Sequence, residues 1–203
     1  MKTRIAVLVS GGGTNLQALI DAAGQGLIPH GELALVVSNR EGAYALERAR
    51  IAGIPARLCV KAAGESASSF EERLLGILRE AAIEMIVLAG FMRVLSADFV
   101  GRYPGRIINI HPSLIPSFCG EGFYGLRVHQ AALDYGVKVT GATVHYVNEI
   151  PDGGRIIAQK AVEVLDGDTP QTLQRRVMEQ AEWVLLPRAA EMVAKQISEE
   201  AER

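Results

Sequence analysis

Two polar side chains with chemical potential interrupt an apolar run near the middle of the chain. Asn109 and His111 lie within and directly after the isoleucine-rich stretch 107–110, and Pro112 follows them. Side chains two positions apart on an extended chain point to the same side, so we expect an amide beside an imidazole. Pro112 disfavours the helical region for His111 and stops a central strand from continuing. Such a pair could stabilise a developing negative charge and transfer a proton at a strand end.

A carboxylate that could act with this pair is Asp152, in the sequence Pro-Asp-Gly-Gly at 151–154. It follows an expected strand end, and the two glycines allow its loop to fold over a site. A carboxylate beside an imidazole favours the protonated ring. The structural alternatives are a hairpin turn at Asp152 and a hydrogen-bonded pair that caps a strand at Asn109 and His111. His145 is as consistent with the core as with a supporting role.

A glycine-rich loop, Ser-Gly-Gly-Gly-Thr-Asn at 10–15, separates the apolar stretch 5–9 from a helical pattern that begins at Leu16. Glycines let the backbone approach a ligand, and the helix N-terminus offers free N–H groups to an anion such as phosphate. The loop matches neither common dinucleotide- nor nucleotide-binding glycine pattern. The structural alternative is a tight turn with Thr14 or Asn15 as the helix N-cap.

Strands and helices alternate along the chain and must position these groups. Apolar stretches predict strands at 4–10, 33–38, 57–60, 85–89, 106–110, 140–147 and 155–164. Helical spacing predicts helices near 16–23, 43–52, 70–82 (capped by Ser69), 96–103, 126–135 and from 170 onward. Pro187 is expected to kink or break the last helix, and residues 198–203 are expected to fray.

This alternation predicts an α/β fold with an open, mostly parallel, doubly wound (Rossmann-like) sheet. An antiparallel strand pair lies near its C-terminal end, and a long C-terminal helix follows. Ligands of such sheets bind at the carboxyl ends of the strands. The loop 10–15, the segment 90–95, and Asn109 with His111 are all expected at such ends.

Composition narrows the class of protein. The 203 residues suit a single domain, and the formal net charge of −2 gives no sign of nucleic-acid binding. The two cysteines, Cys59 and Cys119, match neither a disulfide framework nor a metal site, which favours a reducing compartment. The apolar N-terminal run is too short for a signal segment or a membrane span. We therefore expect a cytoplasmic protein that binds no membrane.

Several motifs together resemble one family over nearly the whole chain. They are SGGGTN at 10–15, VLAGFMRVLS at 87–96, NIHPSLIP at 109–116, TVHYV at 143–147 and PDGG at 151–154. The chain resembles the folate-dependent formyltransferases, and the first motif points to their glycinamide ribonucleotide branch, the phosphoribosylglycinamide formyltransferases (glycinamide ribonucleotide transformylases).

The resemblance implies an enzyme that moves a formyl group from 10-formyltetrahydrofolate, a co-substrate, to the primary amine of 5-phosphoribosylglycinamide. The N-formyl product belongs to de novo purine (IMP) biosynthesis. No metal is implied, and the partners are small molecules, with the enzyme a monomer or homodimer. Residues 1–203 would form one formyltransferase domain, with a nucleotide- and phosphate-binding half at 1–105 and a catalytic and folate-binding half at 106–203.

The resemblance also implies roles for individual residues. Asn109, His111 and Asp152 look like the catalytic trio. The residues that resemble ribonucleotide-binding positions are Gly13, Thr14, Asn15, Gly90, Pro112 and Glu182. Those that resemble folate-binding positions, largely through their backbone, are Met92, Arg93, Val94, Leu95 and Asn109.

The chain departs from the family pattern outside the trio. Ala67 lies near a position where relatives often carry a basic residue that contacts the folate tail. The sequence Ser-Phe-Cys-Gly at 117–120 replaces a usual Pro-Gly, Trp183 replaces a usual His, and Gly12 replaces a frequent Asn.

Four other classes of protein fit the sequence less well. A 10-formyltetrahydrofolate hydrolase would carry an extra N-terminal domain and a methionyl-tRNA formyltransferase an extra C-terminal one, and 203 residues leave room for neither. A non-catalytic nucleotide-binding module has no need of the trio. A dinucleotide dehydrogenase is disfavoured because Ser38 and Asn39 stand where an acidic residue would bind the ribose.

Overall fold

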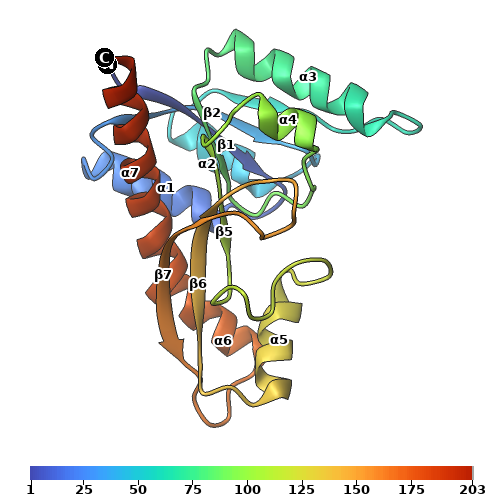
Figure 1. The fold of residues 1–203 in the computed structure, drawn as a ribbon, viewed down its shortest axis with the longest axis vertical. Helices are drawn as coiled ribbons and strands as arrows, with labels where there is room; N and C mark the ends of the chain where they lie inside the picture. The colour runs from blue at the N-terminus through green and yellow to red at the C-terminus, as the bar shows by residue number, and fades with distance from the viewer. Residues whose placement is uncertain (203) are drawn as a thin grey trace.

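The computed structural model describes residues 1–202 and is built on one sheet of seven strands (Figure 1). The strands are β1 (Thr3–Val9), β2 (Gly31–Ser38), β3 (Ala56–Leu58), β4 (Met85–Leu88), β5 (Ile107–His111), β6 (Val139–Tyr146) and β7 (Ile156–Glu163). Their order across the sheet is β3-β2-β1-β4-β5-β6-β7. Strands β1 to β5 pair in parallel, whereas β6 is antiparallel to β5 and β7 to β6. The predicted fold class is confirmed.

Helices cover both faces of the sheet. They are α1 (Thr14–Gly24), α2 (Tyr44–Ile51), α3 (Ala67–Glu80), α4 (Ala97–Gly101), α5 (Leu126–Tyr135), α6 (Pro170–Val177), the π-helix η1 (Met178–Glu182) and α7 (Trp183–Ala201). Within the described part of the chain, none of these helices has the length and apolar character needed to cross a membrane.

The side chains of β1 show how the two layers form. Ile5, Val7 and Val9 join a cluster with apolar residues of α1, α2 and α7, while Ala6 and Leu8 join another with those of α3 and α4. All five are 0% exposed, as a strand covered on both faces requires. Burying one Ile or Leu side chain contributes roughly 1.5–3 kcal/mol, so this strand anchors the core.

The start of α3 differs from the prediction. Ser66, not Ser69, is the N-cap, and its hydroxyl accepts a hydrogen bond of 3.0 Å from the backbone N–H of Ser69. Three further residues therefore join the helix, beginning at Ala67. Both serines carry the same capping group, and sequence spacing alone did not distinguish them.

Of the two outcomes predicted for Pro187, a kink or a break of the last helix, the break was wrong. Pro187 is buried inside α7, which continues to Ala201. The irregular turn lies earlier, in η1, where the N–H of Trp183 donates to the carbonyl oxygen of Met178. This wide turn interrupts the regular i→i−4 hydrogen bonds of the helix just before Pro187. A helix tolerates a proline at such an irregular turn.

The expected fraying of 198–203 was also wrong for the residues that the structure describes up to Ala201. Ser198 Oγ donates to the carbonyl oxygen of Met1 at 3.1 Å, and Thr3 Oγ1 donates to that of Ala194 at 2.8 Å. The end of α7 is therefore tied to the start of the first strand, which begins beside the upper end of this helix in Figure 1. Arg203 lies outside the described residues.

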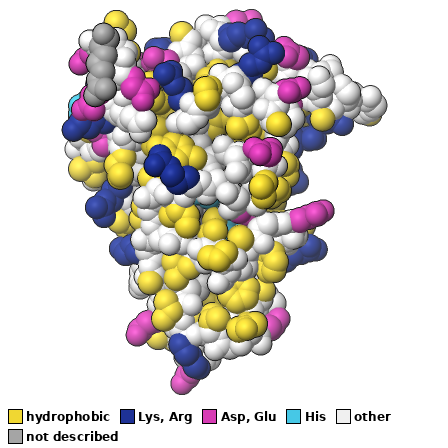
Figure 2. Space-filling model, viewed as in Figure 1, with side chains coloured by type: hydrophobic (Ala, Val, Ile, Leu, Met, Phe, Trp, Pro, Cys, Tyr) yellow, Lys and Arg dark blue, Asp and Glu magenta, His cyan; other side chains and the backbone are white. Residues whose placement is uncertain are grey.

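The sheet topology brings three predicted ligand-binding segments to one edge. β1, β4 and β5 are adjacent and parallel, so the residues that follow them lie at the same end of the sheet. These are the predicted segment 10–15, whose residues from Thr14 belong to α1, the predicted segment 90–95, and the end of β5 itself. On the face shown in Figure 2, Lys and Arg side chains are distributed among acidic and apolar ones rather than gathered into one basic area.

Candidate active site

Asn109 and His111 lie on the last residues of β5, as predicted. Asn109 pairs with Leu88 of β4, and on the other side β5 is covered by the antiparallel strand β6. His111 is 4% exposed, whereas Asn109 is half-buried. The two side chains are thus held by strands on both sides, which gives their positions little freedom.

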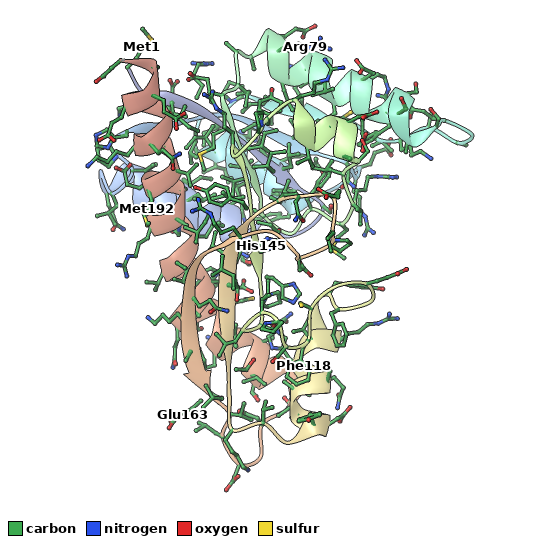
Figure 3. The ribbon with its side chains drawn as sticks, viewed as in Figure 1. Met1, Arg79, Phe118, His145, Glu163 and Met192 are labelled. Atoms are coloured by element: carbon green, nitrogen blue, oxygen red, sulfur yellow. The ribbon has the colours of Figure 1, made fainter. Side chains whose placement is uncertain are left out.

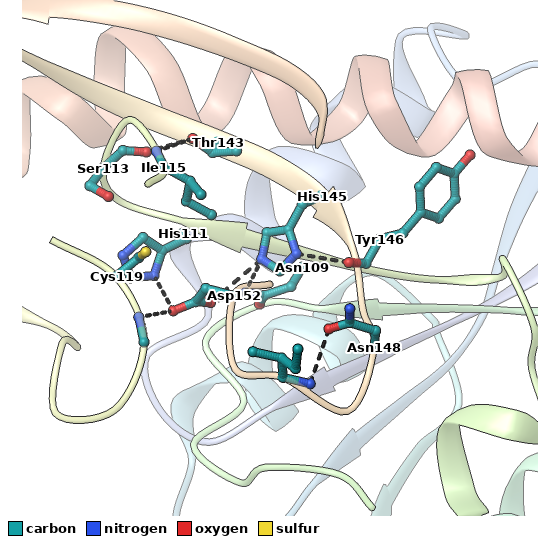
Figure 4. A network of polar contacts seen from close by, with 12 residues as sticks. Asn109, His111, Ser113, Ile115, Cys119, Thr143, His145, Tyr146, Asn148 and Asp152 are labelled. Atoms are coloured by element: carbon teal, nitrogen blue, oxygen red, sulfur yellow. Dashed lines mark hydrogen bonds and ion pairs between the residues drawn. The ribbon is translucent and has the colours of Figure 1, made fainter. Parts of the chain in front are cut away.

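Asp152 joins these two residues, in the network of Figure 4. Its Oδ1 accepts from Asn109 Nδ2 at 3.4 Å, and its Oδ2 lies 3.4 Å from His111 Nδ1. The backbone N–H of Gly120 also donates to Oδ2 at 2.9 Å. Asp152 itself has a φ of 55°, a left-handed conformation that is uncommon for a residue with a side chain and often found at functional sites. The structure therefore brings the predicted trio together through one carboxylate.

The glycines after Asp152 explain why its loop folds back over β5. A Cβ on Gly154 would lie 1.7 Å from the carbonyl oxygen of Tyr146, at the end of β6. A Cβ on Gly153 would lie 2.7 Å from Cβ of Ile150. Only glycine permits such close approach, so these two residues set the position of the carboxylate.

His111 is held between two acceptors. Its Nε2 donates to the carbonyl oxygen of Phe118 at 2.9 Å, so a neutral ring presents its Nδ1 lone pair to Asp152. Burial lowers the pKa of His111, and the charge of Asp152 and the Phe118 contact oppose this only in part. The expected influence of Asp152 is present, but in the ligand-free site the cost of burying a charge outweighs it.

The carboxylate of Asp152 remains the charged member of the trio. Burial alone would raise its pKa, but the nearby ring of His111 and the hydrogen bond from the N–H of Gly120 hold that pKa below its ordinary value. Asp152 is therefore ionised at neutral pH and ready to pair with a proton that arrives on His111.

His145, left open by the sequence, belongs to this network. Its Nε2 lies 3.2 Å from Asn109 Nδ2 and 3.5 Å from Asp152 Oδ1, and its Nδ1 lies 2.9 Å from the carbonyl oxygen of Tyr146. Figure 3 shows it near the middle of the molecule, above Phe118. The pairing register between β5 and β6 would have identified His145, because it places His145 directly opposite Asn109.

His129 on α5 was missed altogether. It is 1% exposed, and neither ring nitrogen has a hydrogen-bond partner among the described residues. Burial, followed by the nearby charge of His111, lowers the pKa of His129 to about 4. The ring therefore stays neutral where an ordinary histidine would take up a proton.

The lowered pKa of His129 predicts that the free energy of unfolding falls in mild acid. In the unfolded chain His129 takes up its proton near pH 6.5, but in the folded protein only near pH 4. Its contribution is fully present above pH 6.5 and is lost as the pH falls below that value, by about 2 kcal/mol at pH 5. Urea unfolding of His129→Leu at pH 7.5 and 5.0 should show a smaller fall than wild type. An equal fall in both proteins would contradict the assignment.

The glycine loop leads into α1 without a side-chain cap. Gly13 occupies the N-cap position with a φ of 72°, so the alternative in which Thr14 or Asn15 caps the helix was wrong. Asn15 Nδ2 instead donates to Glu182 Oε2 at 2.9 Å. Burial raises the pKa of Glu182, and the bond from Asn15 opposes this. The structure thus joins a predicted residue of the loop to a predicted residue of the last helical stretch.

The segment after β4 is tied to the glycine loop. The N–H of Met92 donates to Ser10 Oγ at 2.8 Å, and Ser10 Oγ donates to Asn39 Oδ1 at 2.6 Å. Met92 and Val94 are 46% and 72% exposed, whereas Leu95 is buried in the core. Leu95 therefore offers almost no surface to a ligand, unlike Met92 and Val94.

The remaining predicted residues lie around the same edge. Gly90 has a φ of 73° directly after β4, and Pro112 directly follows His111. The guanidinium of Arg93 stacks over the ring of Phe70, 5.0 Å from its centre, and so points toward α3. No hydrogen bond joins the pair Asn15 and Glu182 to the Asp152 network in the described structure, so the edge holds two separate polar groups.

A wide groove on the described structure does not contain the trio. It has a volume of about 830 Å³, lies between α1 and α7, and reaches Thr14 and Trp183 at one end. Asn109, His111 and Asp152 do not line it. Of the trio, His111 and Asp152 carry groups that can transfer a proton, and Asn109 carries an amide that can donate a hydrogen bond. Among residues 1–202, no group of three or more His, Cys, Asp or Glu side chains could hold a metal ion.

Comparison with known proteins assigns the class. A family model described as formyl transferase matches residues 3–189. The chain belongs to the formyl transferase family. Its sheet of five parallel strands with an antiparallel pair and a long last helix is the fold of solved members.

Particular relatives are similar over most of this chain. The trifunctional purine biosynthetic protein adenosine-3 of Gallus gallus is 46% identical over 95% of this chain and 18% of its own length. The chloroplastic phosphoribosylglycinamide formyltransferase of Arabidopsis thaliana is 39% identical over 87% of this chain and 61% of its own. The crystal structure of glycinamide ribonucleotide transformylase 1 from Symbiobacterium toebii has a TM-score of 0.89 at 43% identity, covering 96% of this chain and 89% of that one. The chain spans less than two thirds of the two sequence relatives.

Proposed function

We propose that the chain transfers a formyl group from 10-formyltetrahydrofolate to the primary amine of 5-phosphoribosylglycinamide, a step of de novo purine (IMP) biosynthesis. The observation that carries this proposal is the position of Asp152, whose two oxygens lie 3.4 Å from Asn109 Nδ2 and 3.4 Å from His111 Nδ1. The choice of substrates is supported by the names of two relatives, which state this activity.

The reaction makes demands that the trio can meet. The amine nitrogen bonds to the formyl carbon, and the carbonyl oxygen becomes an oxyanion in a tetrahedral intermediate. Asn109 offers an amide N–H to that charge, and losing one such donor typically costs about 2.7–4 kcal/mol. The attacking amine then loses a proton, the bond to N10 breaks, and N10 gains a proton. No oxidant or metal is needed to balance these steps.

His111 is the group placed to handle the proton. Its Nδ1 lone pair faces Asp152, so a proton taken there is stabilised at once by the carboxylate. Since burial lowers its pKa, the neutral ring is available as a base in the free enzyme. Asp152 then holds the imidazolium until the proton passes to N10.

Two half-sites flank this centre in the proposal. The loop at Gly13, Thr14 and Asn15, with Glu182, binds the phosphate and ribose of the nucleotide, because the first turn of α1 has no side-chain cap. The segment 92–95, which is exposed except at Leu95, binds the folate through its backbone. The division at residue 105 is therefore only approximate, since each half contributes to both ligands.

Gly13 provides a test of the nucleotide half-site. A Cβ there would lie 2.6 Å from Cβ of Ala45 and 2.9 Å from its Cα, at a φ of 72°. Gly13→Ala should lower the free energy of unfolding by roughly 1–2 kcal/mol or more, raise the KM for the ribonucleotide, and leave folate binding unchanged. Gly12→Ala is the matched control, because no atom lies within 4 Å of its added Cβ. Weakened folate binding with normal nucleotide binding would mean that the half-sites are exchanged.

The proposed activity is tested directly with the purified chain. Formyl transfer from 10-formyltetrahydrofolate to 5-phosphoribosylglycinamide is measured beside two controls, water as acceptor and methionyl-tRNA as acceptor. We expect transfer to the ribonucleotide alone. Faster hydrolysis, or formylation of methionyl-tRNA, would replace this assignment by another member of the formyl transferase family.

A further inference from the structure

The amide of Asn109 can be placed in two ways that differ by a half-turn, and only one of them serves the reaction. With Nδ2 toward the reacting group it donates a hydrogen bond to an oxyanion. With Oδ1 there, it repels the same charge. Oxygen and nitrogen of an amide have nearly the same shape, so packing alone does not choose between them.

The tautomer of His145 favours one of these two orientations of the Asn109 amide. Its Nδ1 lies 2.9 Å from the carbonyl oxygen of Tyr146, which can only accept, so this nitrogen carries a proton. In the neutral ring Nε2 is therefore an acceptor. The group 3.2 Å from Nε2 must be a donor, which is Nδ2 of Asn109.

The same amide nitrogen also serves Asp152. One hydrogen of Nδ2 goes to His145 and the other faces Asp152 Oδ1 at 3.4 Å, the longer of the two contacts. The NH₂ group thus lies between an imidazole lone pair and a carboxylate that are themselves 3.5 Å apart. The second N–H can turn its hydrogen bond from Asp152 to a stronger acceptor, while the hydrogen bond to His145 persists.

The geometry points to His145 as a positioning residue: we propose that its Nε2 fixes the orientation of the Asn109 amide so that N–H, not oxygen, faces the formyl oxygen. This inference rests on the proposed formyl transfer. It assigns to His145 no contact with substrate and no proton transfer. In its absence only the 3.4 Å contact with Asp152 Oδ1 orients the amide, and that contact uses the hydrogen which the oxyanion must draw away.

The backbone around His145 supports this role. The pairing of β6 with β7 shifts between Val144 and His145, so that Val144 faces Ala158 and His145 faces Ile156. Ile157 is left out of the register, as in a bulge. Bulges near active sites commonly re-aim a side chain. His145 is 2% exposed and therefore has no alternative partner in solvent.

The test is a double-mutant cycle with two kinds of readout. His145→Leu keeps the volume and removes the acceptor, and His145→Gln keeps an oxygen acceptor. Each is combined with Asn109→Ala. Thr140→Val, which removes another buried polar group from β6 without touching the network, controls for loss of strand stability. Steady-state kinetics give kcat and KM, and ¹⁵N NMR of the free enzyme at pH 7.5 gives the tautomer of His145.

We expect His145→Leu to lower kcat by on the order of 10² with little change in either KM, as for loss of an oxyanion donor. His145→Gln should recover part of this loss. In the Asn109→Ala background, His145→Leu should have little further effect, because the amide that it orients is gone. NMR should show a neutral ring protonated at Nδ1.

Additive losses in the cycle would overturn the proposal, because a structural role of His145 would not depend on Asn109. A ring protonated at both nitrogens, or at Nε2 alone, would also overturn it. If His145→Leu does not fold, the Gln variant and the NMR tautomer still decide the question. The tautomer is measured without substrate, so it is independent of the proposed function, which fails separately if wild type does not transfer formyl to the ribonucleotide.

Discussion

Asn109→Ala and His111→Ala are each expected to lower the turnover of formyl transfer by roughly 10² or more, with much smaller changes in substrate binding. In the proposed mechanism both side chains act on charge and protons that exist only during the reaction. Asn109, which contacts Asp152, would offer a hydrogen bond to the oxyanion, and His111 would take up a proton beside Asp152. Neither contribution is made to the bound ground state, so removing it affects kcat more than KM.

The measurement is a comparison of kcat and of both KM values with direct binding of each ligand. Gln130→Ala is a suitable control, because this exposed residue of α5 bonds only to Asp134 on the same helix. A variant that loses binding and turnover equally, or loses neither, would remove Asn109 or His111 from the catalytic role. Circular dichroism separates a loss of catalysis from a loss of fold.

Asp152→Asn is expected to leave both ligands bound with similar affinity and to lower turnover strongly. The carboxylate faces Asn109 Nδ2, His111 Nδ1 and the N–H of Gly120. An amide has only one oxygen, so it cannot accept from all these sides. It also removes the charge that stabilises the imidazolium.

The second part of this prediction is a shift in the titration of His111. Burial already holds its pKa below the ordinary value, and the negative charge of Asp152 opposes that shift. Without the charge, the pKa should fall further, and the ring should lose its proton at lower pH than in wild type. NMR titration of the ring in both proteins measures this. An unchanged titration with lost catalysis would mean that Asp152 acts by placing its loop or by passing protons itself.

The sequence predicts the parts of this protein that local rules determine. Buried strands were found within one or two residues, because continuous apolar stretches and glycine boundaries are local signals. Asn109 and His111 were placed together by the two-residue repeat of a strand. Parallel order then brought the loop 10–13 and the end of β5 to one edge. Asp152 came from a motif and could not have been located by spacing.

What the sequence did not reveal depends on distant contacts. His145 became part of the site through the register between β5 and β6, which no single strand specifies. His129 required knowing which face of α5 is buried against the site. The continuation of α7 past Pro187 depends on the π turn before it. The N-cap of α3 is Ser66 rather than Ser69 because of one hydrogen bond.

The attachment of α7 to β1 also bears on how the chain acquires its structure during synthesis. The helix that covers one face of β1 and β2 is translated after all seven strands. Until residues 183–201 leave the ribosome, the apolar side chains that face α7 have no cover. We therefore expect that face of the sheet to stay uncovered until synthesis is nearly complete, and the sheet to gain its stability in a late step rather than strand by strand.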